Sequence, residues 1–298
     1  MGGAFDKEWL ALFRYLQHAR HDAICRKGVM MTKIVIATLI TLGVWAPAAT
    51  ASGESIGTLS HIHVVRAFGD QIILGTHEGL YQYLSEKSVK RINPERFDVM
   101  GLAVSNKGLF ASGHPGPGSK LKEPVGLLFT PKQGGKWQEL SLSGVVDFHT
   151  LETVGDEIYG ADSGSGQLMY SANGGKSWSK RGVNSYTDIA PNPSKRASVV
   201  VVKDGKLFQS TDALKTIKEM KTPFVVESID WIKGSLIAAS GQDLYQSKNA
   251  GKSWKKLVSM PRTISSVTQS NTLIAFVMGS SIYSSRDGGK SFAKYQSG

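Results

Sequence analysis

The chain has 298 residues, of which 41% are hydrophobic and 20% are charged, and it carries a formal net charge of +11. This composition is that of a globular protein, and it excludes an intrinsically disordered chain. The basic surface can attract acidic glycans or an anionic cell wall. No platform of basic and aromatic residues indicates a nucleic-acid partner.

The N-terminal part of the chain is predicted to be removed. Residues 30–51 contain one lysine, an apolar run and the small-residue sequence Ala49-Thr50-Ala51, which is the pattern of a secretory signal peptide. An uncleaved membrane anchor is the alternative, but Pro47 and the cleavage pattern favour removal. Residues 1–29 are interpreted as an upstream extension. The remaining domain, residues 52–298, is expected to have no membrane span and to be extracellular, cell-wall associated or periplasmic.

The chain has one cysteine, Cys25, which lies in the upstream extension. The predicted domain therefore cannot contain a disulfide, and its hydrophobic core must stabilise the fold alone. A domain of this length is large enough for that.

Internal repeats decide the expected fold. An apolar position followed by a polar turn and an aromatic residue recurs at intervals of 37 to 47 residues, at Leu80, Leu127, Leu168, Leu207, Leu244 and Ile282. Each unit reads as four strands, which in the third unit are residues 146–154, 157–163, 167–173 and 177–182. Four antiparallel strands per unit of about forty residues predict an all-β, six-bladed β-propeller. Residues 52–60 are too few for a seventh blade.

The repeats share a turn that we expect between the third and fourth strands, at the outer rim. Its copies are "YSANGGKSW", "YQSKNAGKSW" and "YSSRDGGKSF". The Asn or Asp side chain should bond to the following backbone, the glycines should supply positive φ, and the aromatic residue should pack between blades. The residues concerned are Ser171, Asn173, Gly175, Trp178, Ser247, Asn249, Gly251, Trp254, Ser285, Asp287, Gly289 and Phe292.

These turns resemble the Asp-box, or BNR repeat, of bacterial sialidases and related propellers. Together with "HIHVV", "GTHEGLY" and "DFHTL", they are similar to a group of exported bacterial Asp-box proteins labelled glycosyl hydrolases by similarity. Photosystem II assembly factors and sortilin-type receptors have similar propellers. The resemblance implies a structural role for the turns, away from any active centre.

Histidines are concentrated in the first half of the predicted domain. In a propeller, the first strand of each blade begins, and the second ends, at the same face of the ring. This topology should bring the five histidines of the domain and Asp162 together at one channel mouth. The histidines are His61, His63, His77, His114 and His149. His63 and His149 occupy equivalent positions in their blades, as do His61, Asp98 and Asp147. Converging imidazole and carboxylate groups suit Zn²⁺ or Cu²⁺, although histidines at such a place can also bind only their neighbours and water.

Three functions remain open from the sequence. The first is a binding or scaffolding module, expected to be monomeric, with a glycan, a metal ion or an exported protein as its partner. The second is a glycan-cleaving enzyme that uses Asp147 or Asp162, because glycosidases need paired carboxyl groups. The third is an assembly factor for another exported protein. Sialidase activity is not expected, because only Arg66 lies on a predicted inner strand, so no arginine cluster can bind the substrate carboxylate.

Overall fold

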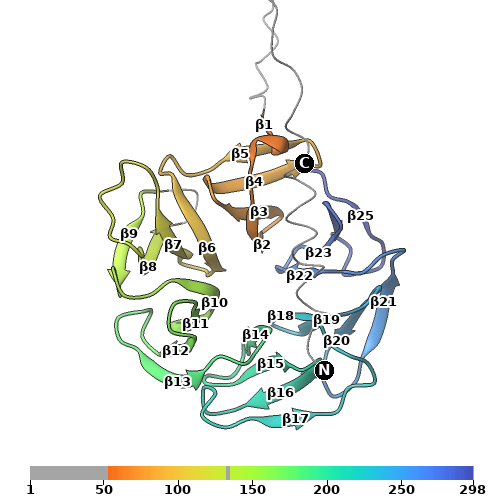
Figure 1. Ribbon diagram of the computed structural model, residues 1–298. Helices are drawn as coiled ribbons and strands as arrows, with labels where there is room; N and C mark the ends of the chain where they lie inside the picture. Colours follow the sequence, from red (N-terminus) through yellow and green to blue (C-terminus); the bar gives the residue numbers. More distant parts are fainter. Residues whose placement is uncertain (1–52, 132–134, 298) are drawn as a thin grey trace, which may run out of the picture. The chain divides into compact units, whose positions relative to one another are not determined.

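Short runs of Val, Ile, Leu and Tyr, separated by glycine-containing turns, form the strands of this protein. The computed structural model describes residues 53–131 and 135–297. The predicted upstream extension, 1–29, and the predicted signal peptide, 30–51, lie outside the described residues. Within the described residues, the strands form six antiparallel sheets, which are arranged radially as the blades of a propeller (Figure 1). The predicted fold class is therefore confirmed.

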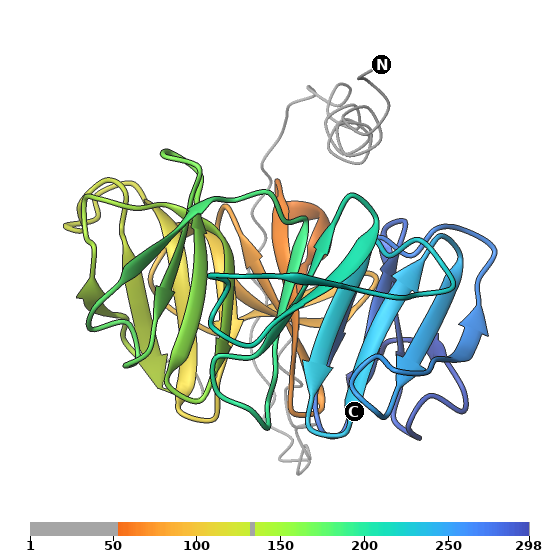
Figure 2. The ribbon, with the colours of Figure 1, turned by 90° about the horizontal axis from the view of Figure 1, so that it is seen from below.

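The blades follow one another along the chain, and Figure 2 shows their strands crossing the thickness of the ring. Blade one contains β1 (Glu54–Ser55), the short 3-10 helix η1 (Ile56–Thr58), β2 (Ile62–Phe68), β3 (Gln71–Thr76), β4 (Gly79–Ser85) and β5 (Ser88–Arg91). Blade two contains β6 (Phe97–Val104), β7 (Gly108–Pro115), β8 (Leu127–Pro131) and β9 (Gln138–Ser141). Blade three contains β10 (Phe148–Val154), β11 (Glu157–Asp162), β12 (Gln167–Ser171) and β13 (Ser179–Val183).

The second half of the ring has the same order of strands. Blade four contains β14 (Asp188–Pro191), β15 (Val199–Lys203), β16 (Lys206–Ser210) and β17 (Lys218–Met220). Blade five contains β18 (Ser228–Ile232), β19 (Ser235–Ser240), β20 (Asp243–Ser247) and β21 (Lys255–Ser259). Blade six contains β22 (Ser266–Gln269), β23 (Ile274–Met278), β24 (Ser281–Ser285) and β25 (Ala293–Lys294). No helix among the described residues is long and apolar enough to cross a membrane.

Blade one has a fifth strand at its outer edge. Residues 52–60 are too few for a blade of their own, and β1 pairs with β5 through Glu54 opposite Val89 and Ser55 opposite Ser88. The backbone N–H of Ile56 also donates to Lys87 O at 3.2 Å. The segment therefore covers part of an edge strand that would otherwise expose unpaired backbone groups.

The hydrophobic core lies between neighbouring blades. Each cluster of buried apolar side chains combines residues of two adjacent sheets, as where Leu127 of blade two meets Phe148 and Ile158 of blade three. Blades six and one meet in the same way, through residues that include Ala275 and Tyr83. A blade cannot bury both of its faces alone, so these contacts close the ring.

The repeated turns have the geometry that the sequence predicts. In blade three, Asn173 Oδ1 accepts the backbone N–H of Ser177 at 2.9 Å, and Ser171 Oγ accepts that of Gly175 at 2.9 Å. Gly175 has a φ of 84°. The Trp178 ring lies 5.1 Å from that of Phe148, centroid to centroid, so it packs at the boundary of blades two and three.

Blade four contains the same turn although its sequence has lost the glycines. Ser210 Oγ accepts from the N–H of Leu214, and Asp212 Oδ1 accepts from that of Thr216. Ala213 and Leu214 take φ values of 55° and 65°, where non-glycine residues are uncommon. The side-chain hydrogen bonds and the burial of Leu214 therefore hold the turn without glycine.

Charged side chains from the inner strands lie near the centre of the ring. Arg66 of β2 donates to Leu102 O at 2.9 Å and to the Glu152 carboxylate of β10. Asp188 of β14 and Asp230 of β18 lie near enough to interact with both. Burial raises the pKa of Glu152 to about 8, and the neighbouring aspartates add to that effect, although Arg66 opposes it.

Candidate functional site

The mouth face of the ring is defined here as the face at which the first strands begin and the second strands end. In blades one to three, the first strand contains a β-bulge at this face. The shift in register falls between Ile62 and Val64, between Val99 and Gly101, and between Phe148 and Thr150. The extra residues are His63, Met100 and His149. A bulge redirects a side chain out of the regular alternation, and in blades four to six the corresponding pairs show no shift.

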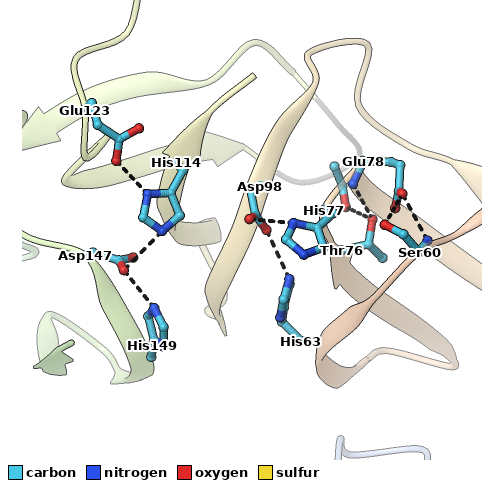
Figure 3. Close-up of polar contacts among 11 residues, drawn as sticks. Ser60, His63, Thr76, His77, Glu78, Asp98, His114, Glu123, Asp147 and His149 are labelled. Atoms are coloured by element: carbon cyan, nitrogen blue, oxygen red, sulfur yellow. Dashed lines mark hydrogen bonds and ion pairs between the residues drawn. The ribbon is translucent and has the colours of Figure 1, made fainter. Parts of the chain in front are cut away.

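The first cluster consists of His63, His77 and Asp98. His63 Nε2 lies 3.1 Å from Asp98 Oδ1, and His77 Nδ1 lies 2.6 Å from Asp98 Oδ2. Burial opposes ionisation of Asp98, but contacts with the two histidines outweigh it and lower the pKa of the carboxyl. The blades thus bring β2, the end of β3 and β6 together around one carboxylate, as Figure 3 shows.

His61 lies beside the first cluster. Its ring centroid is 4.7 Å from that of His77 and 6.1 Å from that of His63. Burial, together with the charges of His77 and His63, lowers its pKa. His61 is therefore a third imidazole next to the carboxylate of Asp98.

The second cluster consists of His114, Asp147 and His149. Asp147 Oδ2 lies 2.7 Å from His149 Nε2 and 3.3 Å from His114 Nε2. Burial opposes ionisation of Asp147, but hydrogen bonds from His149 and Ser163 outweigh it and lower its pKa. Burial also opposes the charge on His114, but its contact with Glu123, at 2.6 Å, and the charges of Asp147, Glu123 and Asp98 together outweigh burial and raise the pKa.

A close backbone approach positions the two clusters next to each other. Asp98 on β6 and His114 on β7 are directly opposed partners in the blade-two ladder. Gly113 has a φ of 146°, and a Cβ on it would lie 1.9 Å from Asp98 O. Only glycine leaves room for this approach, so Gly113 fixes the relative position of Asp98 and His114.

Asp162 lies at the same face, but both of its carboxylate oxygens already accept hydrogen bonds from neighbouring residues. Its Oδ1 accepts the backbone N–H of Asp147 at 2.8 Å, and its Oδ2 accepts from Ser165 Oγ at 2.5 Å. Burial opposes ionisation, but these bonds outweigh it and lower the pKa of Asp162. The geometry thus gives Asp162 the role of positioning Asp147.

The structure brings the predicted histidines to one face, but it divides them into two clusters. Sequence reasoning did not include Asp98 among the ligands, although Asp98 and Asp147 occupy equivalent blade positions. It also missed Glu123, which contacts His114. Glu123 lies in the connection between β7 and β8, and its contact depends on the path of that loop, for which the sequence carries no signal.

Comparisons with known proteins support the fold. No family model matches the sequence, and no curated protein matches it. A chain of the nidogen/laminin complex is similar with a TM-score of 0.56 and 10% identity, over 76% of this chain and 93% of that one. PorZ, described as an essential surface component of the type-IX secretion system of Porphyromonas gingivalis, is similar with a TM-score of 0.53 and 12% identity, over 78% of this chain and 32% of PorZ. At these identities the likeness shows the propeller fold alone.

Proposed function

We propose that this protein is an exported binding module of the Asp-box class that holds a divalent transition metal at the mouth face through His63, His77 and Asp98. Export is proposed from the signal sequence, and membership of the Asp-box class from the repeated turns. The propeller fold agrees with such a role, because propellers present a rigid face on which loops from several blades meet.

The observation that carries the proposal is a pair of buried atoms that face each other without a hydrogen bond. His63 Nε2 and Asp98 Oδ1 are both buried and lie 3.1 Å apart as an ion pair, but neither makes an aligned hydrogen bond among the described residues. Buried polar atoms without aligned hydrogen bonds are costly. A tetrahedral zinc with bonds of about 2.0–2.1 Å places neighbouring ligand atoms roughly 3.3 Å apart, so a metal between the two atoms would satisfy both.

The donor set suits the metals that the sequence suggests. One ligand atom from each of His63, His77 and Asp98 lies within 4.8 Å of the others. Imidazole with carboxylate suits Zn²⁺ and Cu²⁺ better than Ca²⁺ or Mg²⁺, which prefer oxygen ligands. The His61 ring centroid lies 4.7 Å from that of His77 and 6.1 Å from that of His63, so His61 borders the site, and its three ligands are His63, His77 and Asp98.

The test is metal uptake by the full chain after treatment with a chelator. His18, His21 and Cys25, which lie outside the described residues, are replaced by alanine in every variant so that they cannot bind metal. Equilibrium dialysis against Zn²⁺ should show that His63→Ala and His77→Ala each lose one equivalent. Thr76→Ser, at the last residue of β3 and directly before His77, is the control and should keep it. A protein that keeps the same stoichiometry in both histidine variants would contradict the proposal.

The enzyme alternative finds no support in the pKa values of the Asp147 and Asp162 carboxyl groups. A glycosidase needs one carboxyl group with a raised pKa to act as the acid. Hydrogen bonds to both groups outweigh burial and lower both pKa values. We therefore propose binding and not glycan cleavage as the function of this face, with glycans and exported proteins as candidate partners.

A further inference from the structure

Both histidines of the second cluster are open to solvent, whereas only one histidine of the first cluster is. The His114 and His149 side chains are 41% and 45% exposed, whereas in the first cluster that of His77 is 38% exposed and that of His63 is 10% exposed. Both Nε2 atoms nevertheless point to the same oxygen of Asp147, whose side chain is only 9% exposed. Two exposed imidazoles that converge on one buried carboxylate form a preorganised group of donors.

A buried atom of Asp147 marks this cluster independently of the histidines. Asp147 Oδ1 is buried and has no hydrogen-bond partner among the described residues. The ligand atoms of His114, Asp147 and His149 all lie within 4.8 Å of one another. A cation placed among them would be bound by two imidazoles and one carboxylate, the number of protein ligands that zinc has in open sites.

Contacts behind the cluster hold its ligands in orientation. Glu123 Oε1 lies 2.6 Å from His114 Nδ1. If Nδ1–H donates to Glu123, Nε2 is left with its lone pair facing Asp147. Ser163 Oγ donates to Asp147 Oδ2 at 2.7 Å. Carboxylates behind metal-binding histidines fix the tautomer and the orientation of the ring in this way.

We propose that His114, Asp147 and His149 form a second transition-metal site with an open coordination position, which takes a nitrogen or oxygen donor from outside the chain. The second cluster supplies three protein ligands, as the first does, but both of its imidazoles are exposed to solvent. This inference deepens the proposed function, because it makes the second site the place where the module contacts its ligand. It rests on separate residues and can stand or fail separately.

The two sites are close neighbours in the fold. Asp98 of the first and His114 of the second are opposed residues on β6 and β7, and the Cβ atoms of such pairs lie about 5 Å apart. A donor bound at the open position would therefore lie beside the first site. The arrangement fits a donor group on a larger ligand that covers this part of the mouth face.

The experiment uses Co²⁺ as the probe metal, because its visible spectrum reports coordination. The full chain again carries alanine at His18, His21 and Cys25. The otherwise unchanged protein should bind two equivalents, the His63→Ala variant should retain the second site alone, and the His149→Ala variant should retain the first alone. Imidazole should change the cobalt spectrum of the His63→Ala protein, in which only the second site binds cobalt, and an unchanged spectrum would overturn the open coordination position.

A milder variant separates metal binding from folding. Glu123→Gln keeps all three ligands and should weaken cobalt binding at the second site by about 10- to 100-fold, with the unfolding midpoint of the metal-free protein unchanged. The inference fails if a folded His63→Ala protein binds no cobalt, or if His114→Ala and His149→Ala both retain two equivalents. If the parent protein binds one equivalent of cobalt, and His63→Ala keeps it while His149→Ala loses it, the proposed function fails and the second site stands.

Discussion

Thr268 Oγ1 accepts a hydrogen bond from the backbone N–H of Ala67 at 2.9 Å, although the two residues are 201 positions apart in the sequence. Thr268 lies on β22 and Ala67 on β2, so this bond joins the inner strand of the last blade to that of the first. Related bonds join other neighbours, as where Ser228 Oγ accepts the N–H of Val267 at 3.2 Å. Side chains of inner strands thus link neighbouring blades where no backbone ladder can.

Thr268→Val should weaken the closure of the ring. Valine keeps the shape of the side chain but leaves the buried N–H of Ala67 without an acceptor, which costs about 1–3 kcal/mol. Urea unfolding at neutral pH measures the loss. Thr268→Ser keeps the hydroxyl and should lose less than the valine variant. A valine variant as stable as the parent protein would contradict the role of this hydrogen bond.

Gly113→Ala should disturb both histidine clusters at once. The new Cβ would lie 1.9 Å from Asp98 O and 2.9 Å from Met100 N, so β6 or β7 must shift, at a cost of about 1–3 kcal/mol or more. Gly118→Ala is the matched control in the following loop. It also has a positive φ, but its Cβ would meet nothing within 4 Å. We expect reduced Co²⁺ stoichiometry for Gly113→Ala alone. Its urea midpoint should also fall further than that of Gly118→Ala, which adds only the strain of a positive φ, and identical behaviour of the two variants would contradict the close-approach argument.

Glu152→Gln should change how stability depends on pH. Burial raises the pKa of Glu152 to about 8 in the folded state, whereas an unfolded Glu titrates near ~4.3. A group with a raised pKa stabilises the fold fully below its unfolded pKa, and it loses this contribution as the pH rises through the folded value. The free energy of unfolding of the parent protein, relative to the Gln variant, should therefore fall between pH ~4 and ~8. Chemical unfolding at several pH values measures the difference, and a flat or rising difference would refute the assignment.

Ala250→Gly should stabilise the repeated turn of blade five. Ala250 has a φ of 56°, and the corresponding positions in blades three and six are Gly174 and Gly288. Glycine removes the strain of this conformation but adds entropy to the unfolded chain, so the net gain should be at most about 1 kcal/mol. Gly174→Ala is the reverse test and should destabilise by a similar amount. Thermal unfolding of both variants decides the matter, and a loss of stability in Ala250→Gly would count against this account.

The sequence was sufficient to predict the blades because their signals are local. Apolar pairs such as Leu168-Met169 mark the third strand of a blade, and in blades three to six an Asn or Asp turn residue such as Asn173 follows at the same distance. Inner and outer strands could then be assigned by order alone. This assignment also brought His63 and His149 to one face, since first strands begin and second strands end there.

The division into two clusters could not be predicted because it depends on register and backbone contact. A bulge at His63 or His149 adds one residue to one strand against its partner, and the apolar pattern is similar with or without it. The close approach of Gly113 to Asp98 depends on a positive φ at Gly113. A glycine in the sequence allows this conformation but does not predict it. The turn at Ala213 and Leu214 lacks the glycine signal in its sequence, because its hydrogen bonds persist without glycine.

Every blade of the ring is made from one uninterrupted stretch of chain, and both ends of the described part attach to blade one. β1 pairs with β5, and the N–H of Ser297 donates to Leu84 O at 2.9 Å. The contacts between blades therefore depend on which blades are neighbours and not on which blade comes first in the chain. A circular permutant that tethers these two ends and opens a rim turn elsewhere would preserve every inter-blade contact, with the histidines of blades one to three still adjacent.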